Sequence, residues 1–305
     1  MNSKALLLGL FTVVIWGSTF AANSVSLRGG FSAGHLILFR FLLASTLFAI
    51  IACIPSMKIR LPKKQDLWKI MILGWIGISG YHICATNGQL TISAGTAGML
   101  IGSGPIFTTI LAIMILKERL GKIGWVGLGF GFIGIILIAL GSGNTSFGIE
   151  PGVFLTILAA IATSIFFVYQ KPFFTKYSAI ELTAYCTWAG TIPFLIFAPG
   201  LLTTIQSATL EANLTSIYIG IFPTAIAYLT WAMALSLANA SSISSILYLE
   251  PVIAIIVAWI WLNELPSSLS LIGGLIAISG VIIVNFYGKK ETISNNQHNK
   301  IKPIQ

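Results

Sequence analysis

The chain has 305 residues, of which 56% are hydrophobic and only 8% are charged, and its mean hydropathy is +0.93. A soluble globular domain carries about 25% charged residues, so this composition excludes that class and indicates a protein embedded in a lipid bilayer. The net charge of +9 does not indicate nucleic-acid binding, because the Lys and Arg residues lie in short gaps between apolar runs rather than on one face.

Apolar stretches of about 18 to 25 residues recur along the chain, and each can cross a bilayer as a helix. They are continuously apolar rather than alternating with a period of two, which excludes a transmembrane β-barrel. We therefore predict an all-α polytopic membrane protein with ten transmembrane helices. The predicted spans lie near residues 4–26, 32–54, 69–88, 91–116, 121–140, 149–170, 179–198, 213–235, 241–262 and 267–287.

The two ends of the chain differ from the spans between them. The first apolar run begins after Lys4 and ends in small residues, as a signal peptide does. Its length, and the further spans that follow it, favour a retained helix. Residues 289–305 are polar and rich in Asn and Lys, and we expect them to form a disordered cytoplasmic tail.

The chain matches itself without a gap when it is shifted by 146 residues. Composition alone would give about three identities over the best-matching stretch of the chain. Eight are present: Pro105 with Pro251, Ile110 with Ile256, Ala112 with Ala258, Leu116 with Leu262, Glu118 with Glu264, Gly127 with Gly273, Gly134 with Gly280 and Ile136 with Ile282. We predict one five-helix repeat over 1–143 and a second over 147–288.

An odd number of spans in each repeat places the two repeats in opposite orientations in the membrane. Fifteen of the 17 basic residues lie in segments that alternate to one side, which the positive-inside rule assigns to the cytoplasm. We therefore expect a cell inner-membrane protein with both termini cytoplasmic. Inverted repeats are typical of secondary carriers, because one unit inserted both ways builds inward-open and outward-open forms.

Several segments together resemble the EamA family of the drug/metabolite transporter superfamily. They are Trp16–Phe20, Leu38–Ala44, Gly104–Leu120 and Leu249–Glu264. The resemblance covers about residues 4–288 and implies a ten-helix inverted-repeat carrier of a bacterial inner membrane. It further implies a small-metabolite carrier, commonly an amino-acid exporter, whose central cavity is lined mainly by the first, third, fourth, sixth, eighth and ninth helices.

Charged side chains inside a span are costly and usually face the protein interior or water. Arg40 lies within the second span, and its equivalent in the second repeat is Cys186. It is a candidate counter-charge for a substrate carboxylate or a partner for Glu250, or else a structural group bound to backbone carbonyls. Glu250 is a candidate for proton coupling, against the alternative of a helix-end cap.

Two prolines at equivalent positions are predicted to interrupt helices. Pro251 follows Glu250, and Pro105 follows Gly104, so each repeat has a break in the corresponding helix. Paired breaks of this kind are a good sequence indicator of a transporter site.

Neutral polar and aromatic residues within the spans are the remaining candidates for the substrate site. Amide, hydroxyl and aromatic groups together suit a zwitterion with an apolar tail, although a single Trp or Tyr often only anchors or packs a helix. His82 has packing as its alternative role. The candidates are Trp16, Ser18, Asn23, Tyr81, His82, Tyr169, Tyr228 and Trp231.

Other patterns indicate scaffold. Glu118 and Glu264 each lie between two helices, where a carboxylate stabilises a helix N-terminus, with a gating contact as the alternative. Glycines in the fifth and tenth spans favour close helix packing, or alternatively a homodimer face. The three cysteines imply neither a disulfide nor a metal site.

The sequence therefore predicts a secondary transporter that exports amino acids or related amphipathic compounds by alternating access. Its expected partners are a small-molecule substrate, the lipid bilayer and, as a hypothesis, protons. The alternatives are a carrier of drugs, sugars, nucleosides or polyamines, an importer, and a channel-like facilitator. We expect no enzymatic activity, no cofactor and no metal, since the polar residues are scattered and His82 has no convergent ligands.

Overall fold

The computed structural model describes residues 3–54, 59–116, 120–142, 149–237 and 245–287. Within these ranges the chain is helical and has no β-strand. The predicted all-α membrane fold is confirmed at this level: 8 helices are long and apolar enough to cross a membrane, and two shorter apolar stretches, Ile246–Leu262 and Ser268–Val284, follow them. Glu118 and the predicted tail lie outside the described residues.

The first half of the chain contains α1 (Ser3–Arg28), α2 (Ala33–Ala52), α3 (Lys64–Gly74), the π-helix η2 (Trp75–Gly80), α4 (Tyr81–Gly88), α5 (Ala94–Gly102), α6 (Gly104–Leu116) and α7 (Lys122–Leu140). The second half contains α8 (Pro151–Gln170), η3 (Lys171–Thr175), α9 (Ala179–Thr191), η4 (Ile192–Phe197), α10 (Leu201–Ser207), α11 (Leu210–Ile219), the π-helix η5 (Gly220–Ile226), α12 (Ala227–Leu237), η6 (Ser245–Leu249), α14 (Glu250–Leu262) and α15 (Ser268–Tyr287). The short helix α10 was not predicted.

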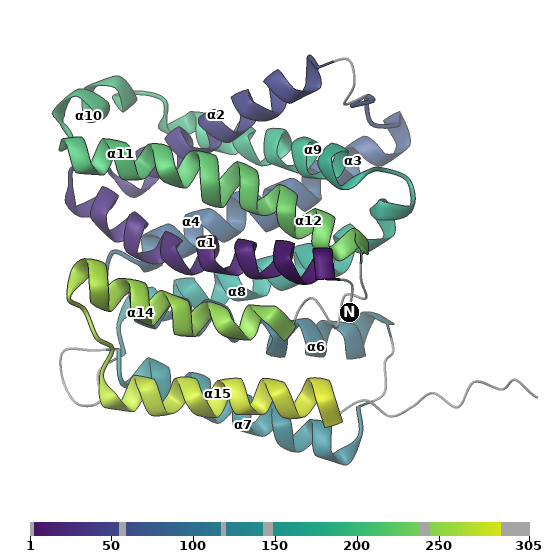
Figure 1. Ribbon diagram of the computed structural model, residues 1–305, viewed down its shortest axis with the longest axis vertical. Coiled ribbons are helices and arrows are strands. Elements are labelled where there is room, and N and C mark those ends of the chain that lie inside the picture. Colours follow the sequence, from purple (N-terminus) through teal and green to yellow (C-terminus); the bar gives the residue numbers. More distant parts are fainter. Residues whose placement is uncertain (1–2, 55–58, 117–119, 143–148, 238–244, 288–305) are drawn as a thin grey trace, which may run out of the picture.

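The helices form a layered bundle in which the chain passes back and forth between two faces (Figure 1). We call the face where α1 begins the N-face and the face where α1 ends the far face. The far face carries an ion pair between Arg28 and Glu264, and the N-face carries one between Lys176 and Asp66, 2.9 Å from Nζ to Oδ1. The helix α8 begins on the far face, close to the end of α7, so α1 and α8 run in opposite directions.

Residues that are 146 positions apart contact each other at the centre of the bundle. The hydroxyl oxygens of Ser45 and Thr191 are 2.8 Å apart, and His82 Nε2 lies 3.2 Å from the Tyr228 hydroxyl. A residue that touches its own equivalent lies on the axis that relates the two copies. The two halves are therefore paired around a pseudo-twofold axis that runs through the bundle.

The glycine pattern holds α7 against α15, side by side at one edge of the bundle (Figure 1). A Cβ atom at Gly127 would lie 2.8 Å from the Gly280 oxygen, and one at Gly273 would lie 2.8 Å from the Gly134 oxygen. These two contacts are equivalents of each other under the 146-residue shift. The predicted scaffold packing is present, and this face of each helix is already covered inside one chain.

Helical irregularities also recur in the two halves. The π-helix η2 matches η5 within one residue after the shift. A glycine lies at the start of each, Gly74 just before η2 and Gly220 as the first residue of η5. A Cβ atom at Gly74 would meet the Cys186 oxygen at 2.7 Å, and one at Gly220 would meet the Arg40 oxygen at 3.2 Å. Single π-helical turns are frequent at functional sites. The places where η2 and η5 meet the other half of the bundle are therefore candidate positions for a site.

The predicted helix interruptions lie at equivalent helix starts. Pro105 is the second residue of α6, and the break between α5 and α6 falls at Ser103. Pro251 is likewise the second residue of α14, which follows the short 3₁₀ segment η6. The two positions are in contact, because a Cβ atom at Gly102 would collide with the ring of Pro251.

Candidate functional site

Arg40 lies at the centre of the bundle with 2% of its surface exposed. Its Nε donates to the Thr224 hydroxyl at 2.9 Å, and that hydroxyl donates in turn to the Ile219 carbonyl at 2.8 Å. The guanidinium carbon lies 5.6 Å from the centre of the Phe41 ring. Thr224 belongs to η5, so the π-helix places the hydroxyl that holds the buried charge.

Glu250 is the second buried charge, with 6% of its surface exposed, and it is the first residue of α14. A carboxylate at this position is stabilised by the positive end of the helix. No ion pair joins it to Arg40 in the described part of the chain. Instead, the tyrosine side chains of Tyr81 and Tyr228 lie within electrostatic range of both charges. The centre therefore holds a guanidinium group, a carboxyl group and two phenol groups.

His82 and Tyr228 connect the two halves across the pseudo-twofold axis. Besides its contact with the Tyr228 hydroxyl, the imidazole packs against Phe41 and Tyr81, with ring centres 4.7 and 4.6 Å away. The histidine is buried. This geometry fits a packing role and also leaves His82 in contact with the polar centre.

Three aromatic rings extend this centre. The Trp16 ring lies 5.6 Å from that of Tyr228 and 5.3 Å from that of Trp231, and Phe167 packs against the other side of Trp231 at 6.1 Å. Trp16 Nε1 donates to the Pro223 oxygen at 3.1 Å. Because α1, α8 and α12 each supply a ring, residues far apart in the sequence form one aromatic wall.

The other predicted substrate contacts lie elsewhere. Ser18 shares a hydrogen bond of 2.6 Å with the Tyr218 hydroxyl, and Asn23 Nδ2 donates to Gln89 Oε1 at 2.7 Å, so both join helices toward the far face. Tyr169 is 46% exposed on the outer surface of α8. These three residues are not brought together with the aromatic wall.

The interrupted helices provide backbone groups close to this region. Ser164 of α8 donates to the Gly104 oxygen at 2.9 Å, which satisfies a carbonyl at the α5–α6 break. Pro251 packs on Gly102, next to Glu250. The break is thus held by neighbouring helices, as backbone irregularity within a membrane requires.

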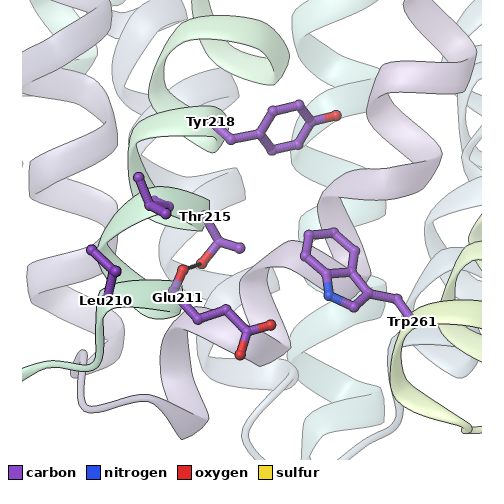
Figure 2. A pocket seen from close by; sticks show the side chains of 6 residues that line it. Leu210, Glu211, Thr215, Tyr218 and Trp261 are labelled. Carbon is purple, nitrogen blue, oxygen red and sulfur yellow. Dashed lines mark hydrogen bonds between the residues drawn. The ribbon is translucent and has the colours of Figure 1, made fainter.

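A surface groove is separate from this centre. Figure 2 shows it between α11 and the end of α14. Glu211 contributes its side chain, while Leu210, Leu214 and Trp261 present exposed apolar surface. In the figure the Thr215 hydroxyl donates to the backbone carbonyl oxygen of Glu211, within the same helix. An open and mainly apolar groove of this kind has few convergent polar groups, so it is a weaker candidate for a specific site.

Sequence reasoning identified Arg40, Glu250 and His82 but missed Thr224. A hydroxyl in an apolar run is common, and the only signal was Pro223, which precedes Thr224 and removes an amide donor from the helix. Among the described residues, no group of three or more potential metal ligands is present.

Comparison with known proteins places these observations in a family. The model of the EamA-like transporter family matches residues 3–140 and again 150–286. An uncharacterised transporter of Bacillus subtilis is 37% identical over 92% of this chain and 89% of its own. A probable terminal-alkyne amino-acid exporter of Streptantibioticus cattleyicolor is 34% identical, over 93% of this chain and 94% of its own.

The fold also matches a solved structure. One crystal structure superposes with a TM-score of 0.64 at 18% identity, covering 93% of this chain and 96% of the other. At this identity the likeness concerns the fold alone.

Proposed function

Because this chain belongs to the EamA-like transporter family and is a multi-pass membrane protein, we propose that it exports an amino acid or a related small amphipathic metabolite. The family relationship accounts for a transporter; the substrate and the direction are our proposal. The name of the Streptantibioticus cattleyicolor relative supports an amino acid. We propose ten membrane-crossing helices in two inverted repeats, with the N-face in the cytoplasm and the protein in the inner membrane.

The observation that carries the proposal is the pair of buried charges at the centre. Arg40 and Glu250 do not neutralise each other directly, and both are within range of Tyr81 and Tyr228. A zwitterionic substrate carries both kinds of charge and an apolar remainder. The rings of Trp16, Tyr228 and Trp231 can pack against the apolar part of the substrate. They can also attract its ammonium group through cation–π interactions.

Glu250 supplies the proposed coupling step. A buried carboxyl group can hold a proton or interact with a substrate ammonium, and it is costly to leave it charged without either. Release of the substrate ammonium on one side followed by protonation of Glu250 would let the carrier return with a neutral carboxyl group at this position. Arg40, which Thr224 fixes in place, then acts as a constant positive charge that orients the phenol groups.

We predict that Glu250→Gln will remove the pH dependence of transport, because an amide neither binds nor releases a proton in this range. The measurement is the initial rate of amino-acid transport in proteoliposomes at several pH values, with Glu211→Gln as the control at an exposed position. An unchanged pH profile in Glu250→Gln would refute the coupling role. Glu211→Gln should behave as the wild type.

The substrate class is tested by a ligand screen of the purified protein. Amino acids, polyamines, sugars, nucleosides and cationic drugs are compared for their effect on the thermal unfolding midpoint. A ligand that binds only the folded protein raises the midpoint, by mass action. We expect a rise with one or more amino acids. A rise with sugars or nucleosides and none with amino acids would replace the proposed substrate.

A further inference from the structure

A small enclosed cavity lies next to the aromatic wall, between η2, α8, α9 and α12. Gln170 is the last residue of α8, and Trp231 is one turn beyond Tyr228 on α12, so the cavity lies on the N-face side of the His82–Tyr228 contact. It has room for about one water molecule. Among the residues that line it are Ile78, Phe166, Gln170, Cys186, Tyr228 and Trp231.

Two hydrogen-bond donors in the cavity wall have no acceptor. Trp231 Nε1 and Gln170 Nε2 are buried without a partner, in side chains that are 3% and 5% exposed. An indole nitrogen can only donate, so its missing partner is an acceptor. Leaving such a group unpaired costs about 1–3 kcal/mol, which indicates that an oxygen occupies this place when the site is filled.

The repeat explains why the cavity is present. Under the 146-residue shift, its wall residues Ile78, Cys186 and Tyr228 are equivalent to Thr224, Arg40 and His82. In one half the long Arg40 side chain fills the space and bonds to Thr224. In the other half the buried side chain is Cys186, which is several atoms shorter. The space that Arg40 occupies in its own half is therefore left open here.

The two hydrogen-bond donors also have no counterparts at the equivalent positions of the other repeat. Gln170 corresponds to Ser24 and Trp231 to Ala85, both of which are too short to reach as far. In the described part of the chain, the two donors therefore lie on the N-face side of the axis and have no counterparts at the equivalent positions. A feature present in one half alone belongs to substrate recognition rather than to the repeated scaffold.

We propose that this cavity is the carboxylate subsite of the transported solute, with one carboxylate oxygen accepting hydrogen bonds from Trp231 Nε1 and Gln170 Nε2. The remainder of the solute, with its ammonium group on the carbon next to the carboxylate, lies against Tyr228 and Trp231. Charge-assisted hydrogen bonds of this kind are about twice as strong as neutral ones. The subsite rests on the proposed function, since it specifies what an amino-acid carrier would hold there.

The test compares amino acids with amines that lack only the carboxylate. The pairs are L-leucine with isoamylamine, L-phenylalanine with phenethylamine, and L-propargylglycine with 3-butynylamine. Binding is measured on the purified full-length protein by the ligand-dependent shift of the unfolding midpoint. Gln170→Met removes a donor at nearly constant volume, Trp231→Phe removes the indole donor, and Cys186→Met fills the cavity. Trp75→Phe is the control, because its indole donates to the Ala189 oxygen outside the cavity.

We expect the wild type to bind an amino acid. Gln170→Met and Trp231→Phe should each bind it at least about tenfold more weakly, because each loses a hydrogen bond to a charged group. Cys186→Met should also weaken amino-acid binding, because its side chain fills the space of the carboxylate oxygen. Amine binding should change by less than about twofold in Gln170→Met and Cys186→Met. In Trp231→Phe it should fall less than amino-acid binding does, because Trp231 also belongs to the aromatic wall. Trp75→Phe should bind both ligands as the wild type does. The unfolding midpoint without ligand shows that each variant is folded. Agreement between Gln170→Met and Cys186→Met guards against a packing defect in Trp231→Phe.

Two results would overturn the subsite. If the variants weaken amino acid and amine equally, or weaken neither, the cavity holds only water and the proposed function still stands. If the wild type binds amines or sugars but no amino acid, the proposed function fails and the subsite fails with it.

Discussion

Single buried side chains carry most of the functional argument. The apolar composition made Arg40 and Glu250 conspicuous, because charge inside a membrane span needs a reason. Their neighbours were not predictable. Tyr169 and Asn23 were expected near the site and lie elsewhere, since nearly every face of these helices is apolar and the sequence gives little information on helix rotation.

Thr224 allows a test of how Arg40 is held. Thr224→Val should destabilise the protein by about 1–3 kcal/mol, because the Arg40 Nε loses its buried acceptor. Thr224→Ser keeps the hydroxyl and is the matched control. The measurement is the free energy of unfolding of both variants in detergent. Equal stability of the two variants would show that Arg40 does not depend on this hydrogen bond.

The helix breaks and π-helices were predictable from the sequence to different degrees. The sequence predicted the break at Gly104 and Pro105, because a proline without an amide donor follows a flexible glycine. It did not predict η2 and η5, whose sequences read as ordinary apolar helix apart from Pro223. The contact between Gly102 and Pro251 was also unpredictable. The 146-residue shift shows that Pro251 is equivalent to Pro105, but it does not show which residues Pro251 contacts.

Gly102→Ala should destabilise the protein by about 1–3 kcal/mol, because its methyl group would collide with Pro251 and push α5 away from α14. Gly129→Ala is the control, since a Cβ atom there meets nothing within 4 Å and alanine favours the helix. Thermal unfolding of both variants gives the comparison. If Gly102→Ala is as stable as Gly129→Ala, the two helices do not pack as closely as described.

At the scale of the whole molecule, the duplication explains both the scaffold and the site. Contacts that both halves make, such as the glycine packing of α7 on α15, belong to the scaffold. We propose that positions where the halves differ, such as Arg40 against Cys186, belong to the site. The 146-residue shift could be read from the sequence. Which equivalent residues meet on the axis could not, because that depends on how the halves dock.

Contacts on the axis should persist when the carrier changes state. If the two halves exchange conformations, a contact between two equivalent residues is replaced by the same contact, so it need not break. A short cross-link between Ser45→Cys and Thr191→Cys, in a Cys53→Ser background, should leave transport intact. The same cross-link between Arg28→Cys and Glu264→Cys should stop it, because this far-face pair joins residues that are not equivalents. Transport in proteoliposomes before and after cross-linking gives the result. Inhibition by the axial cross-link would contradict this view of the axis.

The central claim is that this protein is a carrier that alternates between two faces, and counterflow tests it most directly. Proteoliposomes containing the purified protein are loaded with an unlabelled amino acid that raises the unfolding midpoint, and uptake of the labelled form is followed. A carrier should show saturable uptake that the unlabelled amino acid on the opposite side accelerates. Unsaturable flux without such acceleration would indicate a channel and would rule out alternating access.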